Sequence, residues 1–217
     1  MQVSASRKAR KPGVIVGLVM VLGIAMRLPA AVITLGTAAT VDDLFTGTAS
    51  PIGSVQITSL TVPRLDTSIY SQAYTDGTEY AYLYQLDSEA SSLDPVEQFT
   101  VCPFAGADAS VEMGYLTGTV PDGFLSGVDQ DPEDTGSVYL PTSIVSFYYN
   151  VRAGYELTPG EQSAVMYVMS DLSPGQITGN VINGSVASGN VVGPIPEPTT
   201  MSLLALGGLG LIRRKRK

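Results

Sequence analysis

The chain has 217 residues, with 20 acidic side chains, 12 basic side chains, one cysteine and no histidine, and its formal net charge is −8. The missing histidine excludes Ser-His-Asp and Cys-His catalysis and histidine-ligated zinc, and one cysteine forms no intrachain disulfide or CxxC motif. The acidic balance argues against nucleic-acid binding, and the 23 glycines and 14 prolines favour strands and turns over helices.

The first predicted element is an N-terminal export signal. A basic segment at residues 7–11 precedes an uncharged apolar stretch at residues 13–26, which is the pattern of a secretory signal peptide. As a helix this stretch would span about 21 Å, short of the roughly 30 Å hydrocarbon core, so a lone transmembrane helix is less favoured. We expect residues 1–31 to be a signal peptide that signal peptidase removes after Ala30 or Ala31. An uncleaved anchor is the alternative.

The central region, residues 32–193, is predicted to be built from short strands. Stretches rich in β-branched and aromatic residues alternate with turn signals such as Asp76-Gly77, and no amphipathic helix or internal repeat is found. Strands are predicted, in chain order, for residues 32–35, 54–62, 79–86, 97–101, 137–150 on both sides of Pro141, 164–170 and 176–187. We expect a mainly-β body, a single antiparallel β-sandwich of the jelly-roll or immunoglobulin-like kind, with helix in the two terminal segments. Residues 179–192 are rich in Gly, Asn and Ser, and we expect a last strand there that passes into a linker.

The last predicted element is a short C-terminal membrane segment. Proline bars helix before it, so a helix can begin only after Pro198. Residues 199–212 carry no charge and would make about 21 Å of helix, which is marginal for a lone span. A basic cluster closes the chain and should stay in the cytoplasm under the positive-inside tendency; it consists of Arg213, Arg214, Lys215, Arg216 and Lys217.

The order of these C-terminal features resembles the PEP-CTERM sorting signal. A Pro-Glu-Pro motif, a glycine-containing apolar segment and a terminal Arg/Lys cluster follow one another within residues 194–217. The resemblance implies that Pro196, Glu197 and Pro198 are the recognition motif and that residues 213–217 are the stop cluster. It further implies export, transient retention in the membrane and processing by a membrane-embedded exosortase in a Gram-negative bacterium, often one that makes exopolysaccharide or a biofilm matrix. A simple tail anchor is the alternative.

Removal of both terminal segments would change the charge of the protein. The first 27 residues and the last five hold ten of the twelve basic side chains, which leaves Arg64 and Arg152 in the body. With residues 1–31 and the tail after Pro198 removed, the mature body would carry 2 basic and 20 acidic side chains, a formal charge of −18. Such a charge favours solubility and repels anionic partners. We therefore expect neutral glycans or divalent cations around the body rather than nucleic acid.

Two segments of the body are candidate binding sites. Tyr80, Tyr82 and Tyr84 share one face of a predicted strand, where they could form a platform for sugar rings or pack inward. Residues 129–136 have acidic side chains two positions apart, which suits Ca²⁺, although a solvated acidic loop is the plainer interpretation.

The remaining candidates for chemistry carry no motif. A pair of carboxylates could support glycoside hydrolysis, but Glu112 and Glu156 have no better claim than the other acids. Cys102 could be a reactive or intermolecular thiol, or a small buried apolar residue at a strand end. We expect no catalytic residues, no cofactor and no resident metal, and thus an exported surface or matrix protein. The alternatives are a carbohydrate- or Ca²⁺-binding module with the same routing, or a small acid-pair hydrolase.

Overall fold

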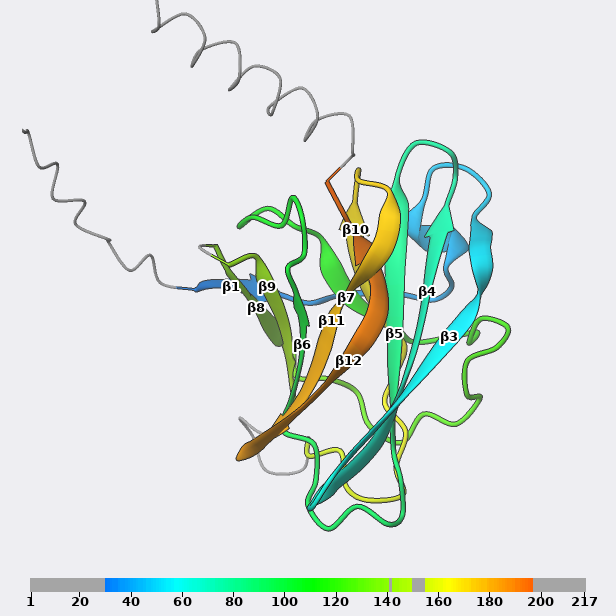
Figure 1. The fold of residues 1–217 in the computed structure, drawn as a ribbon. Coiled ribbons are helices and arrows are strands. Elements are labelled where there is room, and N and C mark those ends of the chain that lie inside the picture. Colours follow the sequence, from blue (N-terminus) through cyan, green and yellow to red (C-terminus); the bar gives the residue numbers. More distant parts are fainter. Residues whose placement is uncertain (1–29, 141, 150–154, 197–217) are drawn as a thin grey trace, which may run out of the picture.

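A computed structural model describes residues 30–140, 142–149 and 155–196, and within these ranges the protein consists of two six-stranded sheets. Figure 1 shows the two sheets side by side. Sheet A contains, in spatial order, β1 (Ala31–Thr34), β8 (Thr135–Tyr139), β9 (Ile144–Tyr148), β6 (Gln98–Cys102), β11 (Pro174–Asn183) and β12 (Ser185–Pro194). Sheet B contains β2 (Gly36–Ala38), β7 (Met113–Leu116), β10 (Met166–Ser170), β5 (Tyr80–Ser88), β4 (Leu65–Thr75) and β3 (Ser50–Val62).

The N-terminal part of the body takes part in both sheets. β1 pairs with β8 in sheet A, the chain then passes through buried Leu35, and β2 pairs with β7 in sheet B. The backbone N–H of Leu35 donates to the carbonyl of Asp134 at 2.9 Å, which holds this crossing in place. The β2–β7 pair is parallel, whereas every other named strand pair is antiparallel. The expectation of a wholly antiparallel body is therefore wrong at this pair.

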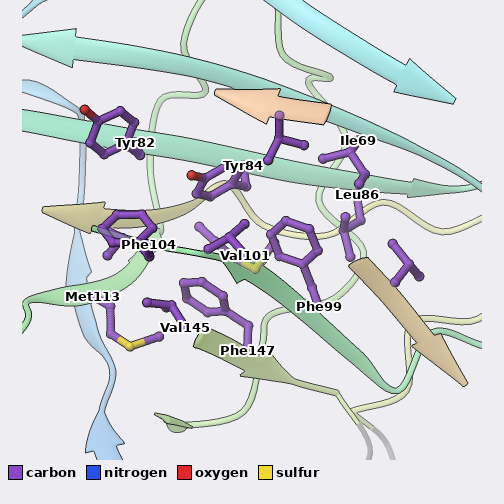
Figure 2. Packing of buried hydrophobic residues seen from close by; sticks show 14 of the residues in the cluster. Ile69, Tyr82, Tyr84, Leu86, Phe99, Val101, Phe104, Met113, Val145 and Phe147 are labelled. Carbon is purple, nitrogen blue, oxygen red and sulfur yellow. The ribbon is translucent and has the colours of Figure 1, made fainter. Parts of the chain in front are cut away.

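The main hydrophobic core lies between the two sheets (Figure 2). Period-two alternation in β5, β6 and β9 directs one side chain in two toward the other sheet. Tyr84 of sheet B contacts Phe99 of sheet A with ring centroids 5.4 Å apart, and Phe99 stacks on Phe147 of the next strand at 6.5 Å. All three rings are fully buried. Aromatic pairs at these spacings add to the free energy gained from buried area, so this cluster ties the sheets together.

A second, smaller core lies on the outer face of sheet B. Leu83, Val165 and Tyr167 point away from the main core and are still buried, because they pack under apolar residues of the loops on either side, including Val41 and Phe124. The covering loops are residues 39–49, which include a 3₁₀ turn, η1 (Asp42–Leu44), and residues 117–128.

Buried Gln85 fastens the second of these loops to the sheet. Its side-chain oxygen accepts from the N–H of Leu125 at 2.8 Å, and its amide nitrogen donates to the carbonyls of Leu125 at 3.1 Å and Ser163 at 3.0 Å. Buried polar groups are costly when unpaired, so these bonds make the position of the loop specific.

The expectation of a mainly-β body is confirmed. The one helical element in the described residues is η1. Strands appear in all seven expected stretches, and Pro141 does separate two strands, β8 and β9. Three further strands, β2, β4 and β7, were not expected. The expected helices at the two termini lie outside the described residues, and within the described part no helix is long and apolar enough to cross a membrane.

Candidate functional site

The sorting tail begins directly at the end of a core strand. β12 pairs with β11 along its whole length, from Ser185 to Pro194. The next residue, Ile195, donates its N–H to the carbonyl of Ser173 at 3.1 Å and packs partly buried against the main core. Its side chain fills the space above Gly175, where an added Cβ would approach Ile195 to 2.6 Å. Pro196 follows and is exposed.

The expected last strand within residues 179–192 is present, and the structure describes the chain beyond it only as far as Pro196. Residues 179–192 form most of a tightly paired β-hairpin, and its second strand leads through anchored Ile195 straight to exposed Pro196. Of the expected recognition motif, Pro196 is therefore the residue that the structure places, immediately beyond the folded body. Glu197, Pro198 and the basic cluster at residues 213–217 lie outside the described residues, as does the expected signal peptide up to residue 29.

Comparison with known protein families identifies this tail. Residues 194–217 match the family model of the PEP-CTERM protein-sorting motif. The chain carries a PEP-CTERM sorting motif. This motif indicates export and sorting to the cell surface, and it implies processing by an exosortase, a membrane enzyme. The sequence-based recognition of the tail is thereby confirmed, and the signal peptide stays a prediction. No curated protein and no solved structure matches the chain significantly.

The tyrosine ladder of β5 is part of the core and forms no platform. Tyr82 and Tyr84 are fully buried between the sheets, as Figure 2 shows, and Tyr80 is partly buried. The Tyr82 hydroxyl donates to the carbonyl of Leu172 at 2.6 Å, and the Tyr84 hydroxyl donates to that of Val192 at 2.7 Å. Burial raises the pKa of both phenols. A sugar ring cannot reach these faces, so the platform hypothesis is wrong.

The acidic segment at residues 129–136 is held against the body by hydrogen bonds. Asp129 accepts from the N–H of Gln162 at 2.9 Å through its carboxylate, and its own N–H donates to the Gln162 carbonyl at 2.9 Å. Glu133 is buried, and its N–H donates to the carbonyl of Tyr148 at 2.8 Å. Burial raises the pKa of Asp131. The described residues contain no cluster of three or more His, Cys, Asp or Glu arranged to hold a metal ion.

The two glutamates named as possible acids are both exposed, and the structure gives them no shared site. Glu112 lines a cavity at one end of the fold together with Glu79, Asp108 and Asp171, and Glu156 is not among its lining residues. Cys102 is partly buried, and its sulfur accepts from the side-chain amide of Asn180 at 3.5 Å. The thiol thus lies among polar neighbours on the outer face of sheet A, not in the apolar core.

That outer face is the feature which the sequence reasoning missed. None of the six strands of sheet A contains Asp, Glu, Lys or Arg, although the chain holds 20 acidic residues. Cross-strand registers place one residue from each strand in a continuous row across the sheet. We call this the central row; it consists of Ser188, Asn180, Thr100, Ser146, Ser137 and Val32.

Hydrogen bonds connect part of the central row. Asn180 donates to the hydroxyl of Thr100 at 3.0 Å and accepts from the hydroxyl of Ser188 at 2.7 Å. Ser137 shares a hydrogen bond of 2.8 Å with the hydroxyl of Tyr148, which stands on the next row. The middle of the row is Ser146, which is only 4% exposed. Its hydroxyl is not among the buried side-chain atoms of the described residues that lack a hydrogen-bond partner.

A partial signal for this face was present in the sequence. In the strand predicted at residues 97–101, apolar Phe99 and Val101 alternate with Gln98 and Thr100. Alternation of this kind indicates one buried and one outward face, and uncharged polar residues take the outward positions. The row itself depends on register between distant strands, which no single stretch of sequence contains.

Proposed function

We propose that this chain is an exported protein of the cell surface or extracellular matrix, routed by its PEP-CTERM motif and without catalytic activity of its own. In this proposal signal peptidase removes residues 1–31. Residues 199–212 then hold the protein in the membrane until an exosortase processes it near Pro196-Glu197-Pro198. The body is a β-sandwich that stays outside and associates with a biofilm or exopolysaccharide matrix.

The observation that carries this proposal is the match of residues 194–217 to the PEP-CTERM sorting motif. Two further features agree with it. The strands of the body run from Ala31 to Pro194, so both proposed cleavage regions lie at the limits of the sheets. The body would have a net charge of −18 if the tail is removed after Pro198, or −17 (2 basic and 19 acidic side chains) if Glu197 leaves with the tail, and either charge suits a soluble surface domain that is repelled by anionic lipids.

The contacts of Ile195 support a processing site just beyond β12. Residues up to Ile195 are held by the pairing of β12 and by the bond to Ser173. A processing enzyme needs an accessible, extended peptide, and the first exposed residue after the strand is Pro196. We therefore expect the cut to fall after Ile195, so that the mature body keeps β12 intact.

The test is replacement of Pro196, Glu197 and Pro198 by alanines in the native host. We expect the protein to stay in the membrane fraction at the size of the unprocessed form. The control is the double change Pro121→Ala and Asp122→Ala in a surface loop, which also removes a proline and an acid and should be processed normally. If the triple variant reaches the surface at the same size as the native protein, the exosortase proposal is wrong.

A further inference from the structure

The edge strand of sheet B, β3, contains a bulge where it pairs with β4 (Figure 1). The register of the two strands shifts between Ile52 and Gln56, so that residues 53–55 lie opposite Gln72 alone. Gly53 has a φ of +70°, which glycine adopts without strain, and a bulge of this kind bends the strand that carries it. The bulge therefore gives the edge of sheet B an irregular surface beside β4.

A cavity of about 450 Å³ lies at this bulge, on the outer face of sheet B. One wall is the bulged part of β3 with Val55 and Ile57, and the other is the tip of the loop at residues 117–128 with Asp122 and Gly123. An added Cβ on Gly123 would lie 2.7 Å from the side chain of Val55, so the two walls meet closely. The lining is mainly apolar, and the volume falls within the range of roughly 300–1,000 Å³ that is usual for small-ligand sites.

Gln72 lines the cavity from β4 with an amide that is only half satisfied. The residue is 4% exposed, and its Nε2 donates to the carbonyl of Gly53 at 2.7 Å, which holds the bulge. Its Oε1 is one of the buried side-chain atoms of the described residues that lack a hydrogen-bond partner. Because the nitrogen is committed to the bulge, the oxygen is the polar atom that Gln72 offers to the cavity. An unpaired buried acceptor is costly, and a ligand that donates to it recovers that cost.

A carboxylate stands at the same cavity. Asp122 lines it and is exposed, and its side chain makes no ion pair or hydrogen bond with another described residue. Tyr74 lines the cavity as well. Burial, and after it the charge of Asp122, raises the pKa of Tyr74, so the carboxylate lies near this ring. The cavity thus combines a free carboxylate and an unpaired amide carbonyl with apolar walls.

We propose that this cavity binds an organic ammonium ion, that is, a primary amine carried on an apolar body. An ammonium group has three donors and no acceptor, which matches the carboxylate of Asp122 and the carbonyl of Gln72. Hydrogen bonds between charged groups are stronger than those between neutral ones, so Asp122 supplies the main polar contact. The apolar part of the ligand then packs on Val55 and Ile57, and Ile57 gains most because it is 57% exposed.

Other classes of ligand fit the cavity less well. An anion would meet Asp122 and find no Lys or Arg among the described lining residues. A wholly apolar ligand would leave the oxygen of Gln72 without its bond, and a neutral alcohol would leave Asp122 without an opposite charge. A second copy of the protein would bring a body with a large negative charge of its own.

The test compares three probes of nearly one shape on the purified full chain in mild detergent. The probes are 2-phenylethylamine, 2-phenylethanol and phenylacetate, which are cationic, neutral and anionic at neutral pH. Titration is followed by the NMR shifts of the backbone amides of Val55 and Gly123. We expect the amine to bind with a Kd on the order of 1 mM, which is ordinary for so small a ligand, the alcohol at least about fivefold more weakly and phenylacetate not at all. Absence of amine binding, or equal binding of all three probes, overturns the inference.

Variants locate the binding to this cavity. Asp122→Asn removes the charge of an exposed side chain and should weaken amine binding about tenfold, whereas Glu156→Gln removes an exposed charge that does not line the cavity and should bind as the native chain does. Gln72→Leu keeps an apolar side chain of similar length and should weaken binding about threefold, with thermal unfolding as the check on its fold. Equal losses in Asp122→Asn and Glu156→Gln would show attraction to the net charge of the body and would overturn the site.

The site and the proposed sorting are tested separately. The loop variant that serves as the sorting control, Pro121→Ala with Asp122→Ala, should be processed normally and should have lost amine binding. A failure of the amine to bind the native chain would therefore leave the sorting proposal standing, and normal amine binding would say nothing about the exosortase.

Discussion

The outer faces of the two sheets differ in the side chains that they carry and in the loops that cover them. On sheet B the outward residues include Ala81, Leu83 and Val165, and these require a cover, which the loops at residues 39–49 and 117–128 provide. On sheet A the outward residues of the central row are mainly Ser, Thr and Asn, which can face water or a polar ligand. The comparison teaches that the loops of this protein bury an apolar face of sheet B, whereas the outward face of sheet A is built from polar side chains, among them Ser137, Ser146 and Thr100.

The largest expected effect is a difference in the free energy of unfolding between a variant on the outer face of sheet B and one on the outer face of sheet A. Leu83→Ala removes a fully buried side chain under the loops and should lower the free energy of unfolding by about 2–5 kcal/mol. Ile182→Ala removes a partly buried side chain from the outer face of sheet A and should cost about 1 kcal/mol. Urea unfolding of both variants gives the two values. Equal costs would mean that both faces are buried to the same degree.

A second prediction concerns the attachment of the loop at residues 117–128. Gln85→Ala leaves the partly buried backbone groups of Leu125 and the buried carbonyl of Ser163 without their partner and should cost about 2–3 kcal/mol. The Leu125 amide should also exchange its hydrogen faster. Asn180→Ala, the matched loss of an amide on sheet A, should cost about 0.5–1 kcal/mol. Unchanged exchange at Leu125 would show that Gln85 does not hold the loop.

A third prediction uses the core that both sheets share. Burial raises the pKa of Tyr84 well above its ordinary value of 10.0, so the neutral phenol is favoured in the folded state. The stability that this provides is complete below pH 10 and is lost as the pH rises above it, because the unfolded chain then releases the proton more easily. Tyr84→Phe should cost about 1 kcal/mol at neutral pH through the lost bond to Val192 and should reduce the alkaline loss. An alkaline loss of the same size in the variant would contradict this assignment.

The smallest expected effect concerns the loop at residues 39–49. Hydrogen bonds from the side chain and backbone of Thr78, and also from the backbone of Gly47 in that loop, lower the pKa of Asp76 to about 2. The contribution of the carboxylate is therefore present above its ordinary pKa of 3.8 and is lost as the pH falls toward 2. Asp76→Ala should unfold at a slightly lower temperature at neutral pH, and the difference from the native protein should close over that acid range. A difference that persists at pH 2 would point to another cause.

Strands were predicted where apolar and polar residues alternate clearly along the sequence, as in β5 and β6. They were missed where both faces of a strand are buried, because the alternation is then absent. β4 was missed because Ser68, Ser71 and Gln72 are buried along with their apolar neighbours, so the strand shows no regular polar face. Residues 179–192 were expected to hold a last strand that passes into a linker, because they are rich in glycine, asparagine and serine, and the structure divides them between β11 and β12. In the structure Gly189 faces inward, where an added Cβ would lie 2.7 Å from the side chain of Leu60. Gly189 therefore allows β12 to pack closely against Leu60.

The two candidate sites differ in how far the sequence could reveal them. The sorting motif is local, because Pro196, Glu197, Pro198 and the basic cluster follow one another in order, and the family model matches the same segment, residues 194–217. The tyrosine platform was wrong, because the face of β5 that carries Tyr82 turns toward sheet A. The central row could not be predicted, because its six residues come from strands that span the chain from Val32 to Ser188 and meet only through register.

The most direct test of the central claim is the intact mass of the protein recovered from the surface of its native host. We predict a chain that begins at Ala31 or Val32 and ends after Ile195, with the complete pair of β11 and β12 and without the basic cluster. A surface protein with the mass of the full chain, or one cut inside β12, would contradict the account.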